Sequence, residues 1–237
     1  MKLIIFDVDG VLRDSAPAGL EGMRRGFVSQ GIEFPFSLKD YRTIRSIGKY
    51  NNSRNALTLM LALTMAGKGV PSSEGEYDSL VQKHVSGKDE EFIDKARSEY
   101  KKFFYSQEAG KFAKILPGVE DALKTLEKYT LTVWSNASKS TIERDMKPII
   151  KYFSFILGGE DVMVKKPSPE GINIIYEKLC TPAGETAYVG DTQVDIQAAK
   201  AAGCTSIILL SEAPDRKILK GADLYFNDIS EMSKEML

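Results

Sequence analysis

Two aspartates, Asp7 and Asp9, follow an apolar run at residues 2–6 and come directly before Gly10. On an extended chain, residues two apart point the same way, so the two carboxylates would lie close enough to perturb each other. Aspartate is depleted in strands, and an unpaired buried carboxylate costs free energy. The pair therefore favours chemistry at the end of a strand, with a plain turn as the alternative.

A second acidic pair, Asp191 and Asp195, follows the apolar run at residues 187–189 and Gly190. If a helix begins near Thr192, the two aspartates lie on one face of its N-terminal end, where the helix dipole favours negative charge. Simple N-capping by Asp191 is the alternative, and it would be preferred if this motif stood alone.

A hydroxyl and a cation complete the set. Ser135 and Asn136 follow the β-type run at residues 131–134, and Lys166 lies in a loop stiffened by two prolines. A serine between a strand and a helix is often only a cap, and a loop lysine is usually solvated. Such a serine can equally bind a phosphate oxygen beside free backbone N–H groups.

Taken together, these residues are an inventory for phosphoryl transfer. Asp7, Asp9 and Asp191 offer the hard oxygen ligands that Mg²⁺ prefers. Ser135 and Lys166 can neutralise phosphate oxygens. In phosphoryl transfer, electrostatics and positioning supply most of the catalysis.

The elements that must position these residues have an α/β pattern. From residue 117 onward, short strands alternate with helices, which predicts βαβ units and a Rossmann-like parallel sheet. Residues 16 to 107 show helical spacing instead. We expect a discontinuous α/β core, residues 1–14 and 96–237, with an inserted α-helical cap at 15–95. The insertion follows the first strand, so it should hang over the carboxyl end of the sheet, where open α/β sheets bind ligands.

The four motifs, in this order, resemble the haloacid dehalogenase superfamily over nearly the whole chain. Residues 7–12 look like its first motif, Ser135 matches the second, Lys166 the third, and Asp191 through Asp195 the fourth. The insertion resembles a C1-type cap. The resemblance implies that the strands carrying Asp7, Ser135 and Asp191 are neighbours in the sheet.

The resemblance also implies a mechanism. Mg²⁺ would be held by Asp7, the backbone carbonyl of Asp9, and Asp191. Asp7 would attack phosphorus and form an aspartyl phosphate, while Asp9 would give a proton to the leaving oxygen and later take one from water. Asp195 would orient a metal-bound water or Lys166. The expected phosphate-binding residues are Ser135, Asn136 and Lys166.

The cap should select the substrate. Arg45 through Gly48, and residues 14–17, resemble segments of phosphoglycolate phosphatases, and an arginine here could bind a small carboxylate in bidentate fashion. A solvated basic helix end is the alternative. Arg13 stands where related sequences often have an apolar residue, and it could enter the site or face solvent. The candidate specificity residues are Arg45, Lys49, Arg54 and Arg13. His84, the only histidine, is given no role.

Three functions stay open. Family dehalogenases carry no aspartate at the position of Asp9, so Asp9 favours a Mg²⁺-dependent phosphatase acting on small phosphate monoesters, with phosphoglycolate as the candidate substrate. A phosphosugar mutase resembling β-phosphoglucomutase would share all four motifs. A catalytically silent member acting as a binding protein is the third alternative, and the intact motifs argue against it.

The composition and net charge of the chain bear on which partners it could bind. The 237 residues are 43% hydrophobic and 27% charged, with a net charge of −1, so no basic field draws the chain to nucleic acid or anionic membrane. Cys180 and Cys204 cannot form a disulfide framework. We expect a cytoplasmic monomer or homodimer whose partner is a small phosphate ester.

Overall fold

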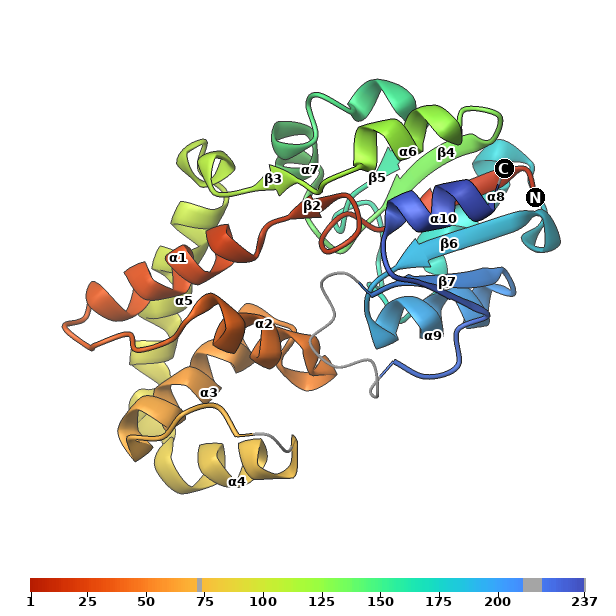
Figure 1. Cartoon of the computed structure of the whole chain (residues 1–237). Coiled ribbons are helices and arrows are strands. Elements are labelled where there is room, and N and C mark those ends of the chain that lie inside the picture. Colours follow the sequence, from red (N-terminus) through yellow and green to blue (C-terminus); the bar gives the residue numbers. More distant parts are fainter. Residues whose placement is uncertain (72–73, 211–218, 237) are drawn as a thin grey trace. The chain divides into compact units, whose positions relative to one another are not determined.

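The computed structural model describes residues 1–71, 74–210 and 219–236 (Figure 1). The chain forms two compact units, Met1–Ser15 with Lys114–Leu237, and Ala16–Ala113. The first boundary lies one residue from the expected one. The second lies later than the expected 95/96, because that position falls inside helix α5 (Glu90–Phe104), which packs on α1 (Ala16–Val28) as part of one helical body.

The first unit contains a six-stranded parallel sheet with the order β5-β4-β1-β6-β7-β8. Its central strand β1 (Leu3–Phe6) pairs with β4 (Thr130–Trp134) on one side and β6 (Thr186–Gly190) on the other. These are the strands that precede Asp7, Ser135 and Asp191, so the expected adjacency is confirmed. The outer strands are β5 (Phe155–Leu157), β7 (Thr205–Leu209) and β8 (Leu224–Phe226).

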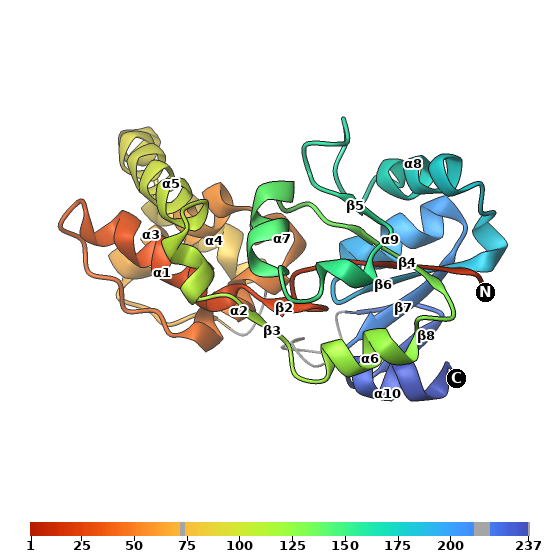
Figure 2. The same ribbon diagram turned by 90° about the horizontal axis from the view of Figure 1, so that it is seen from above.

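Helices cover both faces of this sheet (Figure 2). Ile4 and Phe6 belong to a core cluster with α6 (Val119–Thr125), α7 (Lys139–Asp145) and α10 (Ile229–Glu235). Leu3 and Ile5 belong to the opposite cluster, with α8 (Glu170–Leu179) and α9 (Gln193–Ala202). Because β1 is buried on both faces, its sequence is a continuous apolar run without alternation.

Short elements complete the first unit. A two-residue strand, β2 (Arg13–Asp14), pairs antiparallel with β3 (Lys114–Ile115), where the chain leaves and re-enters the core. The sequence did not predict this pair, because two residues are too few to show a period. Single 3₁₀ turns lie at η4 (Ile150–Tyr152) and η5 (Ala183–Glu185).

The second unit is helical, as expected, and has its own apolar core. Phe27, Met60 and Ile93 are buried there. None of the helices in the described part of the chain is long and apolar enough to cross a membrane. Besides α1 and α5, the unit contains α2 (Leu38–Ser46), η1 (Gly48–Tyr50), α3 (Ser53–Ala66), α4 (Glu74–His84), η2 (Gly87–Asp89) and η3 (Glu108–Lys111).

Candidate functional site

The carboxyl ends of β1, β4 and β6 place polar residues at one edge of the sheet. The backbone N–H of Asp7 donates to the Val189 carbonyl at 2.8 Å, which extends the β1–β6 pairing by one residue. In the same way, the N–H of Ser135 donates to Leu157 at 3.2 Å. The backbone of these residues is therefore fixed by the sheet and not by a free loop.

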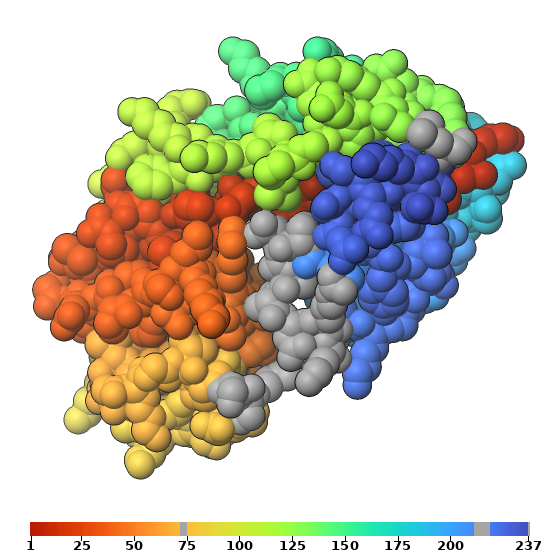
Figure 3. All heavy atoms as spheres, in the orientation of Figure 1, coloured from red at the N-terminus to blue at the C-terminus, as the bar shows by residue number. Residues whose placement is uncertain are grey.

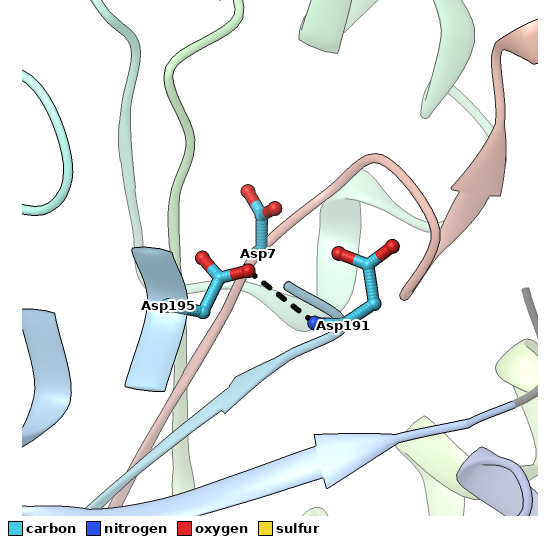
Figure 4. Close-up of side chains that lie close together, drawn as sticks. All are labelled: Asp7, Asp191 and Asp195. Atoms are coloured by element: carbon cyan, nitrogen blue, oxygen red, sulfur yellow. Dashed lines mark hydrogen bonds between the residues drawn. The ribbon is translucent and has the colours of Figure 1, made fainter. Parts of the chain in front are cut away.

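Three carboxylates converge at this edge. Oxygens of Asp7, Asp191 and Asp195 lie within 4.8 Å of one another (Figure 4). The Oδ1 atoms of Asp7 and Asp191 are buried and have no hydrogen-bond partner among the described residues. Asp7 Oδ1 does lie 2.9 Å from Lys166 Nζ as an ion pair. Buried anionic oxygens with too few donors are costly, and a single ammonium does not neutralise three carboxylates, so Asp7 and Asp191 fit a bound metal ion.

Asp195 differs from the other two because both of its oxygens are occupied. Oδ1 accepts from Lys166 Nζ at 2.7 Å, and Oδ2 accepts from the Thr192 N–H at 3.0 Å, from the Thr192 hydroxyl and from the Asp191 N–H at 3.3 Å. Thr192 and Asp195 thus form a capping box at the start of α9. The cap is Thr192, so the alternative that Asp191 caps the helix is wrong, and Asp191 lies before the helix.

Lys166 is buried, with 2% of its side chain exposed. Its ammonium contacts Asp7 Oδ1 at 2.9 Å and Asp195 Oδ1 at 2.7 Å, and its backbone N–H donates to Asn136 Oδ1 at 3.0 Å. The alternative of a solvated loop lysine is therefore wrong. Asn136, which follows β4, holds the Lys166 loop against the loop that carries Ser135.

Tyr188 is a site residue that the sequence analysis missed. Its hydroxyl accepts from Lys166 Nζ at 2.7 Å and donates to the Trp134 carbonyl at 3.0 Å. The side chain lies on β6 and faces away from Ala187 and Val189. A tyrosine in an otherwise apolar buried strand needs a partner for its hydroxyl, and that signal could have identified it.

The direction of the pKa shifts in this cluster indicates an excess of negative charge around Lys166. Burial raises the pKa of Asp7 to about 6 against the opposing Lys166 ammonium, and Asp195 and Asp9 add to the rise. Burial and the neighbouring Asp195 and Asp7 raise the pKa of Asp191 well above its usual range. Burial alone would lower the pKa of Lys166, but the two carboxylates outweigh it and the pKa is raised. A divalent cation would relieve this repulsion.

Asp9 lies beside this cluster with 39% of its side chain exposed. Its Oδ1 accepts from Arg13 Nε at 2.8 Å and from Ser15 Oγ at 2.5 Å, and its Oδ2 accepts from Arg13 Nη2 at 3.3 Å. Burial tends to raise the pKa of Asp9, but Arg13 and Ser15 hold it below its usual range. Arg13 and Ser15 therefore favour the carboxylate form of Asp9, and the acid form that a proton donor needs would be the less favoured one in the ligand-free site.

Arg13 does not face solvent. It has no exposed surface and lies in the first unit, whereas Arg45, Lys49 and Arg54 lie in the second. Four hydrogen bonds to protein acceptors occupy its guanidinium. The structure therefore places Arg13 behind Asp9 and not on a substrate-facing surface.

Two of the cap candidates are paired within the second unit. Lys49 Nζ lies 2.7 Å from Asp78 Oδ1. Arg54 forms ion pairs with Glu90 and Asp94. Both cations are already compensated by carboxylates on neighbouring elements.

Arg45 lies in the last turn of α2 and differs from these two. Its Nη1 is buried and has no hydrogen-bond partner among the described residues. Its guanidinium carbon is 5.8 Å from the centre of the Tyr41 ring. Arg45 therefore keeps donor capacity that a ligand carboxylate could use.

Gly10 is required by the close approach of Asp191. Its φ is +78°, and a Cβ there would lie 1.9 Å from Asp191 Oδ2.

We predict that Gly10→Ala lowers the free energy of unfolding by more than the ~1–2 kcal/mol that a left-handed residue costs by itself. Gly31→Ala is the control, because Gly31 has a φ of +72° and nothing within 4 Å of its would-be Cβ. The measurement is urea unfolding of both variants. If Gly10→Ala and Gly31→Ala lose the same free energy of unfolding, the close approach of Asp191 to Gly10 is not the cause.

Comparison with known proteins agrees with this geometry. The family model of the haloacid dehalogenase-like hydrolases matches residues 1–203. The phosphoglycolate phosphatase of Salmonella typhi is 31% identical over 217 residues, covering 86% of this chain and 79% of that protein.

Two solved structures share the fold. A proposed phosphoglycolate phosphatase of Lactobacillus delbrueckii subsp. bulgaricus has a TM-score of 0.78 at 22% identity, covering 100% of this chain and 99% of the other. A proposed β-phosphoglucomutase of Thermotoga maritima has a TM-score of 0.66 at 24% identity, covering 100% of both chains. At these identities the likeness concerns the fold alone. With its family match and its relative at 31% identity, the chain belongs to the haloacid dehalogenase-like hydrolases.

Proposed function

We propose that this protein is a Mg²⁺-dependent phosphatase that hydrolyses small organic phosphate monoesters through an aspartyl phosphate on Asp7. The observation that carries the proposal is the cluster of Asp7, Asp191 and Asp195 carboxylates beside the buried ammonium of Lys166. In this cluster the buried Asp191 Oδ1 has no hydrogen-bond partner among the described residues, and Asp7 Oδ1 has only the Lys166 ammonium. The similarity to a relative named phosphoglycolate phosphatase supports the same reaction class.

The metal ligands in this proposal are the side chains of Asp7 and Asp191 and the backbone carbonyl of Asp9. An all-oxygen set with no histidine or cysteine suits Mg²⁺ better than Zn²⁺. When bound, Mg²⁺ would neutralise charge on the phosphoryl oxygens. Asp195 does not join this set, because its oxygens hold Lys166 and the start of α9.

The side chains would then divide the reaction as follows. The Asp7 carboxylate attacks phosphorus as the ester P–O bond breaks, and Asp9, which enters this step in its acid form, gives its proton to the leaving oxygen. Water then attacks the phosphorus, Asp9 takes its proton, and the Asp7 carboxylate is regenerated. The donors proposed to hold the phosphoryl oxygens are the Ser135 hydroxyl, the Asn136 amide nitrogen and the Lys166 ammonium.

The test is phosphate release from a panel of small phosphate esters, with Mg²⁺ and with a chelator. We expect multiple turnovers that need Mg²⁺ and no added bisphosphate. A requirement for a sugar bisphosphate would instead identify a mutase. A folded protein that releases no phosphate from any ester would support the silent binding protein.

The substrate proposal is phosphoglycolate, with Arg45 binding its carboxylate. We predict that Arg45→Ala lowers kcat/KM for phosphoglycolate roughly tenfold or more, because a charge-assisted contact of about 1.5–3 kcal/mol is lost. An uncharged phosphate ester should lose little, since the phosphate-binding residues are unchanged.

Arg54→Ala is the matched control, because Arg54 is already paired with Glu90 and Asp94. Equal losses of Arg45→Ala on both esters would assign Arg45 to cap stability. A larger effect of Arg54→Ala would move the carboxylate site to Arg54.

The cellular setting is also a proposal. Cys180 and Cys204 are both free thiols, which is compatible with a reducing cytoplasm. Whether the protein is a monomer or a homodimer, and whether it lacks nucleic-acid and membrane partners, are predictions that sedimentation and binding assays would test.

A further inference from the structure

Arg13 is a fully buried cation whose backbone position is fixed by the loop that follows β1. Its N–H donates to the Val8 carbonyl at 3.0 Å, and its own carbonyl accepts from the Gly10 N–H at 2.9 Å. The loop therefore folds back on itself. This closure brings Arg13, four residues after Asp9 in sequence, directly against the Asp9 carboxylate.

The Arg13 guanidinium binds the Asp9 carboxylate in bidentate fashion. Nε donates to Oδ1 at 2.8 Å and Nη2 donates to Oδ2 at 3.3 Å, while Ser15 Oγ donates to Oδ1 at 2.5 Å. A carboxylate oxygen accepts about two hydrogen bonds. Oδ1 is therefore saturated, and Oδ2 keeps one acceptor position for a further partner.

The other edge of the guanidinium is anchored to α7. Nη1 donates to the Thr141 carbonyl at 2.9 Å and to Asp145 Oδ2 at 2.5 Å, and Asp145 Oδ1 accepts from Arg144 at 2.5 Å. The exposed fractions of the side chains are 39% for Asp9, 0% for Arg13, 1% for Asp145 and 10% for Arg144. This row of alternating charges therefore has its most exposed end at Asp9.

We propose that Arg13 is a positioning residue, which fixes the orientation of the Asp9 carboxyl group so that Oδ2 gives its proton to the leaving oxygen and then, as a carboxylate, takes one from water. The proposal rests on the proposed function, in which Asp9 moves those protons. Arg13 has no exposed surface and thus acts only through Asp9. A lysine would keep the charge but lose the planar fork that sets the carboxylate's orientation.

A double-mutant cycle of Arg13→Lys and Asp9→Asn tests this role. With an alkyl phosphate ester, Arg13→Lys should lower kcat roughly tenfold or more, part of the 10²–10⁴-fold that general acid–base catalysis contributes, with little change in KM. In the Asp9→Asn background the same substitution should cost less than about twofold, because there is no carboxylate left to orient. Arg24→Lys, at an exposed arginine paired with Glu21, is the matched control.

An equal loss of kcat in both backgrounds would show that Arg13 only supports the fold and would overturn the proposal. Circular dichroism and thermal unfolding identify folded variants. If Arg13→Lys does not fold, Asp145→Asn releases Arg13 from its far side, and the same cycle with Asp9→Asn gives the same two outcomes. Failure of the proposed function is distinguishable, because the wild-type protein would then release no phosphate.

Discussion

Asp7→Asn is expected to abolish turnover while the protein stays folded. An amide nitrogen cannot attack phosphorus, so the loss of kcat should be on the order of 10⁴-fold or more. Burial raises the pKa of Asp7 to about 6, so its charge is held at a cost in the folded protein. Removing that charge should not lower the thermal midpoint of the metal-free protein.

The comparison variant is Asp121→Asn, which changes the same groups on a side chain that is 89% exposed. It should match the wild type in both activity and stability. Substantial Mg²⁺-dependent activity in pure Asp7→Asn protein would remove Asp7 from the nucleophile role.

Asp191→Asn should have opposite effects on stability with and without metal. Without Mg²⁺, the substitution removes one of three crowded carboxylates, whose repulsion and burial raise the pKa of Asp191 well above its usual range. A raised folded pKa means that the ionised form destabilises the fold at neutral pH. The metal-free thermal midpoint should therefore rise.

With Mg²⁺ present, the same variant should lose the metal-induced rise in thermal midpoint. Loss of residues around metal ligands commonly costs 10–100-fold, so loss of a ligand should lower kcat/KM by at least roughly 100-fold. Thermal scans of the wild type and the variant across a Mg²⁺ titration measure both the change in the metal-free thermal midpoint and the size of its Mg²⁺-induced rise. A variant that is destabilised without Mg²⁺, or that keeps the wild-type Mg²⁺ response, would contradict the assignment of Asp191 as a ligand.

The sequence predicted those features that rest on local patterns. The parallel sheet followed from the apolar runs and their alternation with helices. The position of Asp7, Ser135 and Asp191 at one edge of the sheet followed from their places just after such runs. Because parallel strands bring their carboxyl ends to one edge, three motifs far apart in the chain had to meet.

What the sequence did not predict depends on long-range burial. A single arginine in a sequence does not indicate whether its side chain is exposed or buried. The ion pair of Arg13 with Asp145 therefore became evident only from the position of α7 in the structure. Tyr188 was missed because it was counted as strand core, although its hydroxyl required a partner. The second domain boundary was placed too early because α5 is one continuous helix and carries no break at residue 95.

Figure 3 shows one face of the molecule with its heavy atoms as spheres, in the orientation of Figure 1. The proposed nucleophile, Asp7, is buried, so it has to be identified chemically. The most direct measurement is acid quenching during turnover of phosphoglycolate with Mg²⁺, followed by peptide mass spectrometry. We expect one phosphoryl group on the peptide that contains Asp7, absent from Asp7→Asn and lost once the substrate is exhausted. A phosphoryl group on another residue, or steady turnover by Asp7→Asn, would contradict it.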